Sequence, residues 1–347
     1  MKNWLRKTFS FNASPVEEQQ VIDPALPTKA EGFLKRLEWT TVRRLDGILQ
    51  GDYRTLFRGA GLDFADLREY QSHDDVRHID WNVTARTGTP HVRVFTEDRE
   101  MAAWFVLDLS ASVDFGSGER RKRDVANELT VVLGRVLTGH GNRVGALLYG
   151  GAGNIARGAS AKGAGGGIDK LIPSGGGRRH VLHLAHEMLN HRAASNGGQT
   201  DLRSLLDAAA HVIKRRSTVF VISDFFSTPG WSAPLQQLAR RHDVTAIRLL
   251  DPLEMKLPDM GLISLRDPET GETQVVDCDA KFLRRFEQLA STQEATLREQ
   301  LASSGVDTLE ISTQDDLADA LIRFCALRRR KSRTRASQNL HSLAQAA

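Results

Sequence analysis

Three oxygen-bearing side chains, those of Asp108, Ser110 and Ser112, stand at the end of an apolar run. Residues 103–107 are too apolar and too short for anything but a buried strand, so the carboxylate and both hydroxyls follow the end of that strand. A carboxylate with hydroxyls is the oxygen-only ligand set that a hard divalent cation prefers. The spacing therefore predicts one part of a metal site.

Two further oxygen ligands lie far along the chain. Thr200 follows a Gly-Gly-Gln turn and precedes a predicted helix, and Asp224 ends the apolar run Val-Phe-Val-Ile-Ser. Ligands of parallel α/β sheets gather at the carboxyl ends of strands, so we expect both residues beside Asp108. The set holds no nucleophile or base with an evident role, which predicts ligand capture through a metal and an adaptor more than an enzyme.

Asp-x-Ser-x-Ser alone also fits a simpler interpretation. Asp108 would then cap the following helix, and the two serines would be ordinary turn residues. The matching positions of Thr200 and Asp224 at other element ends favour the metal interpretation over this one.

The elements that must position these residues alternate between strands and helices from residue 101 onward. We expect strands at 103–107, 144–149, 218–223, 244–250 and 308–311, and helices at 121–137, 181–189, 201–214, 233–241, 280–303 and 315–330. This alternation predicts an α/β fold with a mostly parallel central sheet and helices on both faces. The glycine-rich stretch 163–177 lacks Gly-Lys-Ser/Thr and predicts a long turn, and Asp267-Pro-Glu-Thr-Gly271 predicts a β-hairpin.

Composition limits the class of protein further. With 47 Lys and Arg against 43 Asp and Glu, and the basic excess gathered at Arg328–Arg335, the rest of the chain is close to neutral and does not suggest a nucleic-acid groove. We expect that basic run to be a solvated helix end. Cys278 and Cys325 have no CxxC partner, and no apolar stretch reaches the roughly 18 residues of a membrane span. The expected location is the cytoplasm.

The order Asp-x-Ser-x-Ser, then Thr, then Asp resembles the metal-ion-dependent adhesion site of von Willebrand factor A-type domains, over residues 101–328. The resemblance implies a six-stranded Rossmann-like sheet and a bound Mg²⁺, with Mn²⁺ or Ca²⁺ as alternatives. The implied ligands are Asp108, Ser110, Ser112, Thr200 and Asp224. Phe225 departs from the pattern, because many members have glycine there, and Gln199 is an insertion.

Sequence segments before residue 101 point to a particular family. The segments at 58–64, 67–70, 74–77, 79–81, 85–88 and 92–95 resemble the bacterial domain-of-unknown-function family fifty-eight, over roughly residues 40 to 330. This resemblance implies an adaptor or scaffold that works with a MoxR-type AAA+ ATPase in chaperone-like assembly or maturation of a client protein. The unknown client would supply a carboxylate to the metal.

The upstream segment is also dense in arginine and acidic residues. Its candidate partner-binding residues are Arg68, Asp74, Asp75, Arg77, Asp80, Trp81 and Arg86. A structural network of ion pairs that braces the sheet is the alternative that we favour for this segment, with Trp81 as a packing anchor.

The chain divides into four predicted parts: a flexible lead-in at 1–28, a family-specific polar segment at 29–100 that packs on the main domain, the metal-binding domain at 101–330, and a basic flexible tail at 331–347. A metal-dependent hydrolase that takes its general base from the acidic stretch 74–80 is the alternative function. Nucleic-acid binding through the basic tail ranks last.

Overall fold

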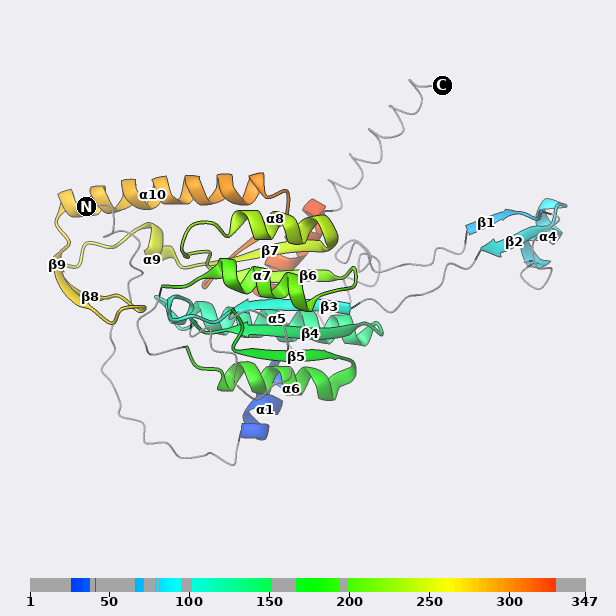
Figure 1. Ribbon diagram of the computed structural model, residues 1–347, viewed down its shortest axis with the longest axis horizontal. Helices are drawn as coiled ribbons and strands as arrows, with labels where there is room; N and C mark the ends of the chain where they lie inside the picture. The colour runs from blue at the N-terminus through cyan, green and yellow to red at the C-terminus, as the bar shows by residue number, and fades with distance from the viewer. Residues whose placement is uncertain are drawn as a thin grey trace, which may run out of the picture.

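A six-stranded sheet forms the centre of the computed structural model, which describes residues 26–37, 41, 66–71, 79, 81–94, 102–151, 167–193 and 199–328 (Figure 1). The strands are β3 (Ala102–Asp108), β4 (Arg143–Tyr149), β5 (Lys170–Gly175), β6 (Thr218–Ser223), β7 (Asp243–Leu250) and β10 (Asp307–Ser312). Their order is β10-β7-β6-β3-β4-β5, and every neighbouring pair is parallel except β4 and β5. The predicted fold class, a mostly parallel α/β sheet, is confirmed.

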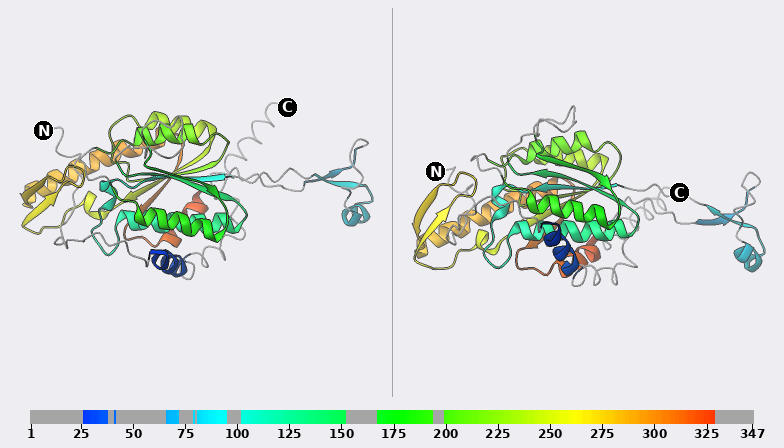
Figure 2. Two further views of the ribbon diagram at one scale, coloured as in Figure 1. Left: turned by 60° about the horizontal axis from the view of Figure 1, so that its bottom comes forward. Right: turned by 90° about the horizontal axis from the view of Figure 1, so that it is seen from below.

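Helices cover both faces of the sheet, as the edge-on views of Figure 2 show. The covering helices are α5 (Lys122–Gly139), α6 (Gly177–Asn190), α7 (Leu202–Val212), α8 (Ser232–Arg241) and α10 (Ala280–Ser303). Phe105 and Leu107 of β3 pack with α5 and α6, whereas Val106 between them packs with α7, α8 and α10. Because both faces are covered, β3 and β6 are apolar along most of their length and show no polar alternation.

The chain outside this sandwich contains shorter elements. These are α1 (Leu26–Leu37), β1 (Asp66–Glu69), α4 (Trp81–Thr87), β2 (His91–Val94), the 3₁₀ turn η4 (Ala111–Asp114), α9 (Pro252–Met255), β8 (Leu262–Arg266) and β9 (Thr273–Asp277), and residues 317–328 are also helical. Leu37 of α1 is buried in the cluster formed with α5 and α6. The antiparallel pair β1–β2 and α4 lie beyond the amino end of β3 in Figures 1 and 2. The four predicted parts of the chain stay a prediction.

The prediction of one long turn over residues 163–177 is wrong. Lys170–Gly175 is the edge strand β5, which pairs antiparallel with β4 through Leu171 and Ile172. Its glycine and proline content hid the strand from sequence reasoning. Pro173 is tolerated because an edge strand has one side on which no backbone N–H is needed for pairing.

The prediction that the basic run is a solvated helix end is wrong for Arg328. Its guanidinium is buried and donates to both carboxylate oxygens of Asp243, at 2.6 and 2.8 Å, and to Asp307 at 3.1 Å. Asp243 begins β7 and Asp307 begins β10, so Arg328 ties the last described helix to two neighbouring strands. None of the helices in the described ranges is long and apolar enough to cross a bilayer.

We predict that Arg328→Ala lowers the free energy of unfolding by about 3 kcal/mol, because two carboxylates lose a buried, bidentate partner. Urea denaturation followed by circular dichroism measures this change. Arg323→Ala on the same helix, where the side chain is exposed, is the matched control and should change stability little. Equal effects of the two substitutions would contradict the structural role of Arg328.

Candidate metal-binding site

Asp108 and Asp224 lie side by side at the carboxyl edge of the sheet. Asp108 is the last residue of β3, Asp224 directly follows β6, and the two strands are neighbours in parallel register with Leu107 opposite Ile222. Both carboxylates are fully buried. The Ser223 hydroxyl donates to Asp108 Oδ2 at 2.7 Å and fixes that carboxylate against the end of β6.

Ser110 and Ser112 are held close to Asp108 by the turn that leaves β3. The backbone N–H of Ser110 donates to Asp108 Oδ1 at 3.1 Å, and Ser110 is the residue before the 3₁₀ turn η4, which contains Ser112. The two serine hydroxyl oxygens lie 3.2 Å apart, and both side chains are buried. The spacing of the motif thus brings the three oxygen-bearing side chains together at this edge, and their role as metal ligands stays a prediction.

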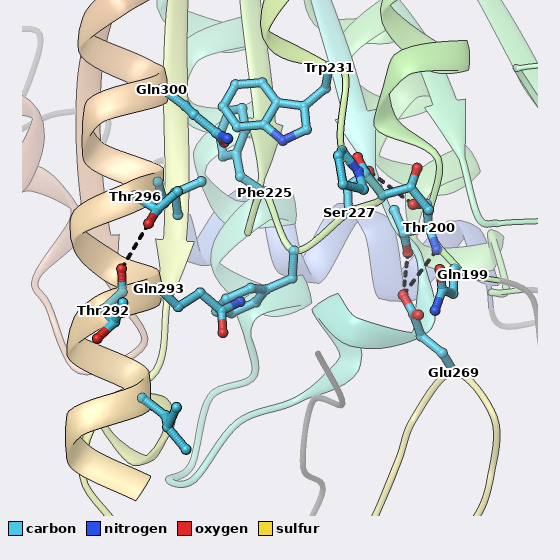
Figure 3. A pocket seen from close by; sticks show the side chains of 15 residues that line it. Gln199, Thr200, Phe225, Ser227, Trp231, Glu269, Thr292, Gln293, Thr296 and Gln300 are labelled. Atoms are coloured by element: carbon cyan, nitrogen blue, oxygen red, sulfur yellow. Dashed lines mark hydrogen bonds between the residues drawn. The ribbon is translucent and has the colours of Figure 1, made fainter. Parts of the chain in front are cut away.

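Thr200 reaches the same edge from the loop before α7. Its carbonyl accepts the backbone N–H of Thr228 at 3.0 Å and the Ser227 hydroxyl at 2.9 Å, both from the loop that follows Asp224. The Thr200 side chain is buried and its hydroxyl donates to Glu269 Oε1 at 2.6 Å (Figure 3). The sequence predicted the position of Thr200 but not its carboxylate partner.

Lys122, the first residue of α5, is a buried cation that the sequence analysis missed. Its Nζ donates to Asp224 Oδ2 at 2.7 Å and to Glu254 Oε1 at 2.6 Å, and it lies within 6 Å of the ring centroids of Phe115 (5.9 Å) and Phe226 (5.4 Å). Burial by itself lowers the pKa of the Lys122 ammonium, but the two carboxylates outweigh burial and raise it. Lys122 therefore stays charged and neutralises part of the site.

Glu254 and Glu269 complete the group of buried or partly buried acids. Glu254 is the third residue of α9 and accepts the Asp251 backbone N–H at 3.0 Å, which closes a capping box. The sequence Asp251-Pro-Leu-Glu254 carries that signal, although it does not reveal the contact with Lys122. Glu269 lies in the predicted turn between β8 and β9, and only the fold brings it to Thr200.

Negative charge dominates this cluster. Burial, and next the charge of Asp224, raise the pKa of Asp108 to about 6. Burial likewise raises the pKa of Glu254 and of Glu269, and Asp224 adds to both shifts. The cluster thus holds four carboxylates and one ammonium, which contacts Asp224 and Glu254, and its excess is three negative charges when every acid is ionised.

The donor set fits a hard divalent cation. Asp108, Ser110, Ser112, Thr200 and Asp224 offer only oxygen atoms, and a divalent ion would offset two of the three excess charges. One oxygen atom is less available to a cation, because Lys122 already donates a hydrogen bond to Asp224 Oδ2. Oδ1 of Asp224 accepts the Phe226 backbone N–H at 3.0 Å and retains a second lone pair.

Phe225 stands at the position where the adhesion-site pattern often has glycine. Its φ of 60° lies in the left-handed region, where glycine is favoured and another residue costs roughly 1–3 kcal/mol. The side chain is buried and contacts Trp231 at a ring-centroid distance of 5.1 Å, which offsets that cost. The turn at Phe225 also lets its backbone N–H donate to the Ser223 hydroxyl at 2.8 Å, so the strained residue helps to order the site.

The three candidate partner-binding residues that the structure describes are not brought to this edge. Arg68 lies on β1, Trp81 begins α4 and Arg86 lies near the end of α4, at the opposite end of the sheet in Figure 1. Trp81 is 69% exposed, so the prediction that it is a packing anchor is wrong. Asp74, Asp75, Arg77 and Asp80 lie outside the described residues, and so does most of the alternative acidic stretch 74–80.

Fold and site together define an α/β protein with an oxygen-rich, negatively charged site at the carboxyl edge of its sheet. The chain belongs to the family described as "Protein of unknown function DUF58", which matches residues 66–296. An uncharacterized protein of Mycobacterium tuberculosis is 36% identical over 302 residues, which cover 87% of this chain and 90% of that protein. The "Uncharacterized protein in moxR 3'region" of Paracoccus denitrificans is 34% identical over 99 residues, 28% of this chain and 94% of that protein.

Two solved structures are similar at low sequence identity. The conserved hypothetical protein BatB from Bacteroides thetaiotaomicron is 12% identical, with a TM-score of 0.39, and the match covers 66% of this chain and 99% of BatB. A von Willebrand factor type A protein from Catenulispora acidiphila is also 12% identical, with a TM-score of 0.29, and the match covers 67% of this chain and 42% of that one.

We predict that, without metal, Asp108→Asn raises stability at pH 8 by up to about 3 kcal/mol, since the folded-state pKa of about 6 lies above the unfolded value of 3.8. A raised carboxyl pKa makes the folded state bind the proton more tightly, so wild-type stability falls as the pH rises from about 4 through about 6. The variant should lose that slope.

Urea denaturation in EDTA across this pH range measures both effects. Asp207→Asn, which changes a half-exposed acid on α7, is the matched control and should keep the wild-type slope. An Asp108→Asn protein that is less stable than wild type at pH 8, or equally pH-dependent, would contradict the electrostatic account of the site.

Proposed function

We propose that the protein is a Mg²⁺-dependent protein-binding adaptor that captures a carboxylate of a partner at the carboxyl edge of its sheet. The observation that carries this proposal is the group of buried oxygen ligands with an excess of negative charge. The Ser110 and Ser112 hydroxyl oxygens lie 3.2 Å apart, and the Ser110 side chain also hydrogen-bonds to Asp108. Carboxylate and hydroxyl oxygens in this arrangement are suited to hold a hard cation.

Asp108, Ser110, Ser112, Thr200 and Asp224 would hold the Mg²⁺. When bound, the ion supplies a position at which an external carboxylate can be coordinated. Five protein ligands leave one position of an octahedral ion open, and an external carboxylate could fill that position. Lys122 and Glu254 fix the orientation of Asp224 beneath the site and keep it from turning away.

We further propose that a MoxR-type AAA+ ATPase is a partner and that the adaptor serves assembly or maturation of a client protein. The relative from the moxR 3' region of Paracoccus denitrificans supports this link through the position of its gene. A carboxylate of the client or of the ATPase would then be the group captured at the site. The cytoplasm is the location at which such an ATPase would meet the chain.

We expect the wild-type protein to bind one equivalent of Mg²⁺ per chain in isothermal titration calorimetry, and Asp108→Ala to lose this binding. In a pull-down from a bacterial lysate with tagged full-length chain, the wild type should retain a MoxR-type ATPase in Mg²⁺ and lose it in excess EDTA. Asp108→Ala should fail to retain it in either condition.

Asp207→Ala is the control for loss of an acidic side chain outside the site, and it should behave as wild type in both assays. Far-UV circular dichroism checks that each variant is folded. Retention of the ATPase by Asp108→Ala, or by wild type in excess chelator, would count against metal-dependent capture.

A further inference from the structure

Glu269 is presented to the site by a turn whose backbone is tightly fixed. Oδ1 of Asp267 accepts the backbone N–H groups of Glu269 at 2.9 Å and Thr270 at 3.3 Å. The Asp267 N–H donates to the carbonyl of Glu272 at 2.8 Å, and Gly271 takes the left-handed φ of 74° that closes the turn. The β8–β9 hairpin thus holds one carboxylate at a defined place beside the sheet edge.

That carboxylate engages a residue of the proposed metal site directly. Oε1 of Glu269 accepts both the hydroxyl of Thr200 at 2.6 Å and its backbone N–H at 3.1 Å (Figure 3). Asp108 and Asp224 belong to the ends of the central strands, whereas Glu269 approaches from a separate hairpin. Its position is the one from which an external carboxylate would approach Thr200.

A pocket of about 330 Å³ adjoins this contact. Thr200 and Glu269 lie on one side of it, α10 lies on the opposite side with residues that include Gln293, and Phe225 and Trp231 lie between the two sides (Figure 3). Of the described residues that line the pocket, only Glu269 carries a charge. The remaining lining combines aromatic and aliphatic surface with amide and hydroxyl groups, which suits a short peptide segment.

The hairpin is attached to the rest of the protein by few apolar contacts. Ile263, Leu265 and Cys278 form a small cluster against the start of α10, separate from the two large clusters of the sheet. Leu262 and Val275 of the hairpin are 73% and 68% exposed. Movement of β8–β9 would therefore leave the core of the sheet intact.

We propose that Glu269 is an internal ligand that occupies the place of a partner's acidic side chain. A partner segment with a Glu or Asp side chain binds by displacing Glu269 from Thr200, and the residues beside that acid enter the pocket along α10. This inference deepens the proposed function and rests on it for the identity of the site. The hairpin sets a threshold for binding, because a tethered carboxylate competes at an effective concentration on the millimolar scale.

The test uses N-acetyl-glutamate N-methylamide as the acidic probe and N-acetyl-glutamine N-methylamide as its neutral counterpart. The reporter is the Thr200 amide in full-length protein labelled with ¹⁵N-threonine, followed by NMR. Glu269→Ala should shift this signal, and the acidic probe should move it back toward its wild-type position. We expect the apparent affinity of Glu269→Ala for the acidic probe to be at least about tenfold that of wild type.

Glu272→Ala removes an exposed carboxylate from the same hairpin and is the matched control, which should match wild type. The neutral probe should leave the Thr200 signal of every variant unchanged. Equal responses of wild type and Glu269→Ala to the acidic probe, or no response of either, would overturn the inference. Thermal melting identifies a variant that has not folded, and Glu269→Gln then serves as the second substitution.

A parallel titration with Mg²⁺ alone separates this inference from the proposed function. Failure of Mg²⁺ to bind wild type, with the Thr200 amide still rescued only in Glu269→Ala, would reject the metal-dependent function and leave the internal ligand standing. Normal Mg²⁺ binding with no selective rescue would reject the internal ligand and leave the proposed function standing.

Discussion

The repulsion between two buried carboxylates, those of Asp108 and Asp224, is the constraint on which the rest of the site depends. The parallel register of β3 and β6 puts the two acids side by side, and burial removes the water that would otherwise screen them. Several nearby groups reduce that cost. Ser223 and the Ser110 backbone donate to Asp108, and the buried ammonium of Lys122 binds Asp224. The compensation is incomplete, so the edge keeps an excess of negative charge, on which the proposed binding of a cation rests.

The buried charge at this edge lowers the stability of the folded protein, and the apolar core offsets that loss. The apolar strands and the helices on both faces supply the folding energy that permits buried charge and a left-handed Phe225. Arg328 contributes in the same way at the other end of β7 and β10, where its guanidinium joins two acids. A site with this much unfavourable charge persists because the surrounding structure fixes it.

The position of the hairpin connects the site to its proposed regulation. Glu269 adds one more negative charge to an edge that already has an excess, yet Thr200 holds it with two hydrogen bonds. Repulsion from the neighbouring acids favours the replacement of Glu269 by another ligand, and only a small apolar cluster holds its hairpin in place. Competition between an internal and an external carboxylate would make capture of a partner reversible, as an adaptor that passes a client to an ATPase requires.

The sequence by itself predicted most of the sheet, its covering helices and five candidate oxygen ligands, because apolar runs indicate buried strands and because parallel strands bring their carboxyl ends to one edge. Asp108 and Asp224 follow directly from that rule. It missed β5, since glycine and proline mask an edge strand. Only the tertiary structure decided that Lys122, Glu254 and Glu269 join the site. Their contacts join residues more than 65 positions apart, and such contacts depend on how a helix start, a capped turn and a hairpin pack, which no local periodicity records.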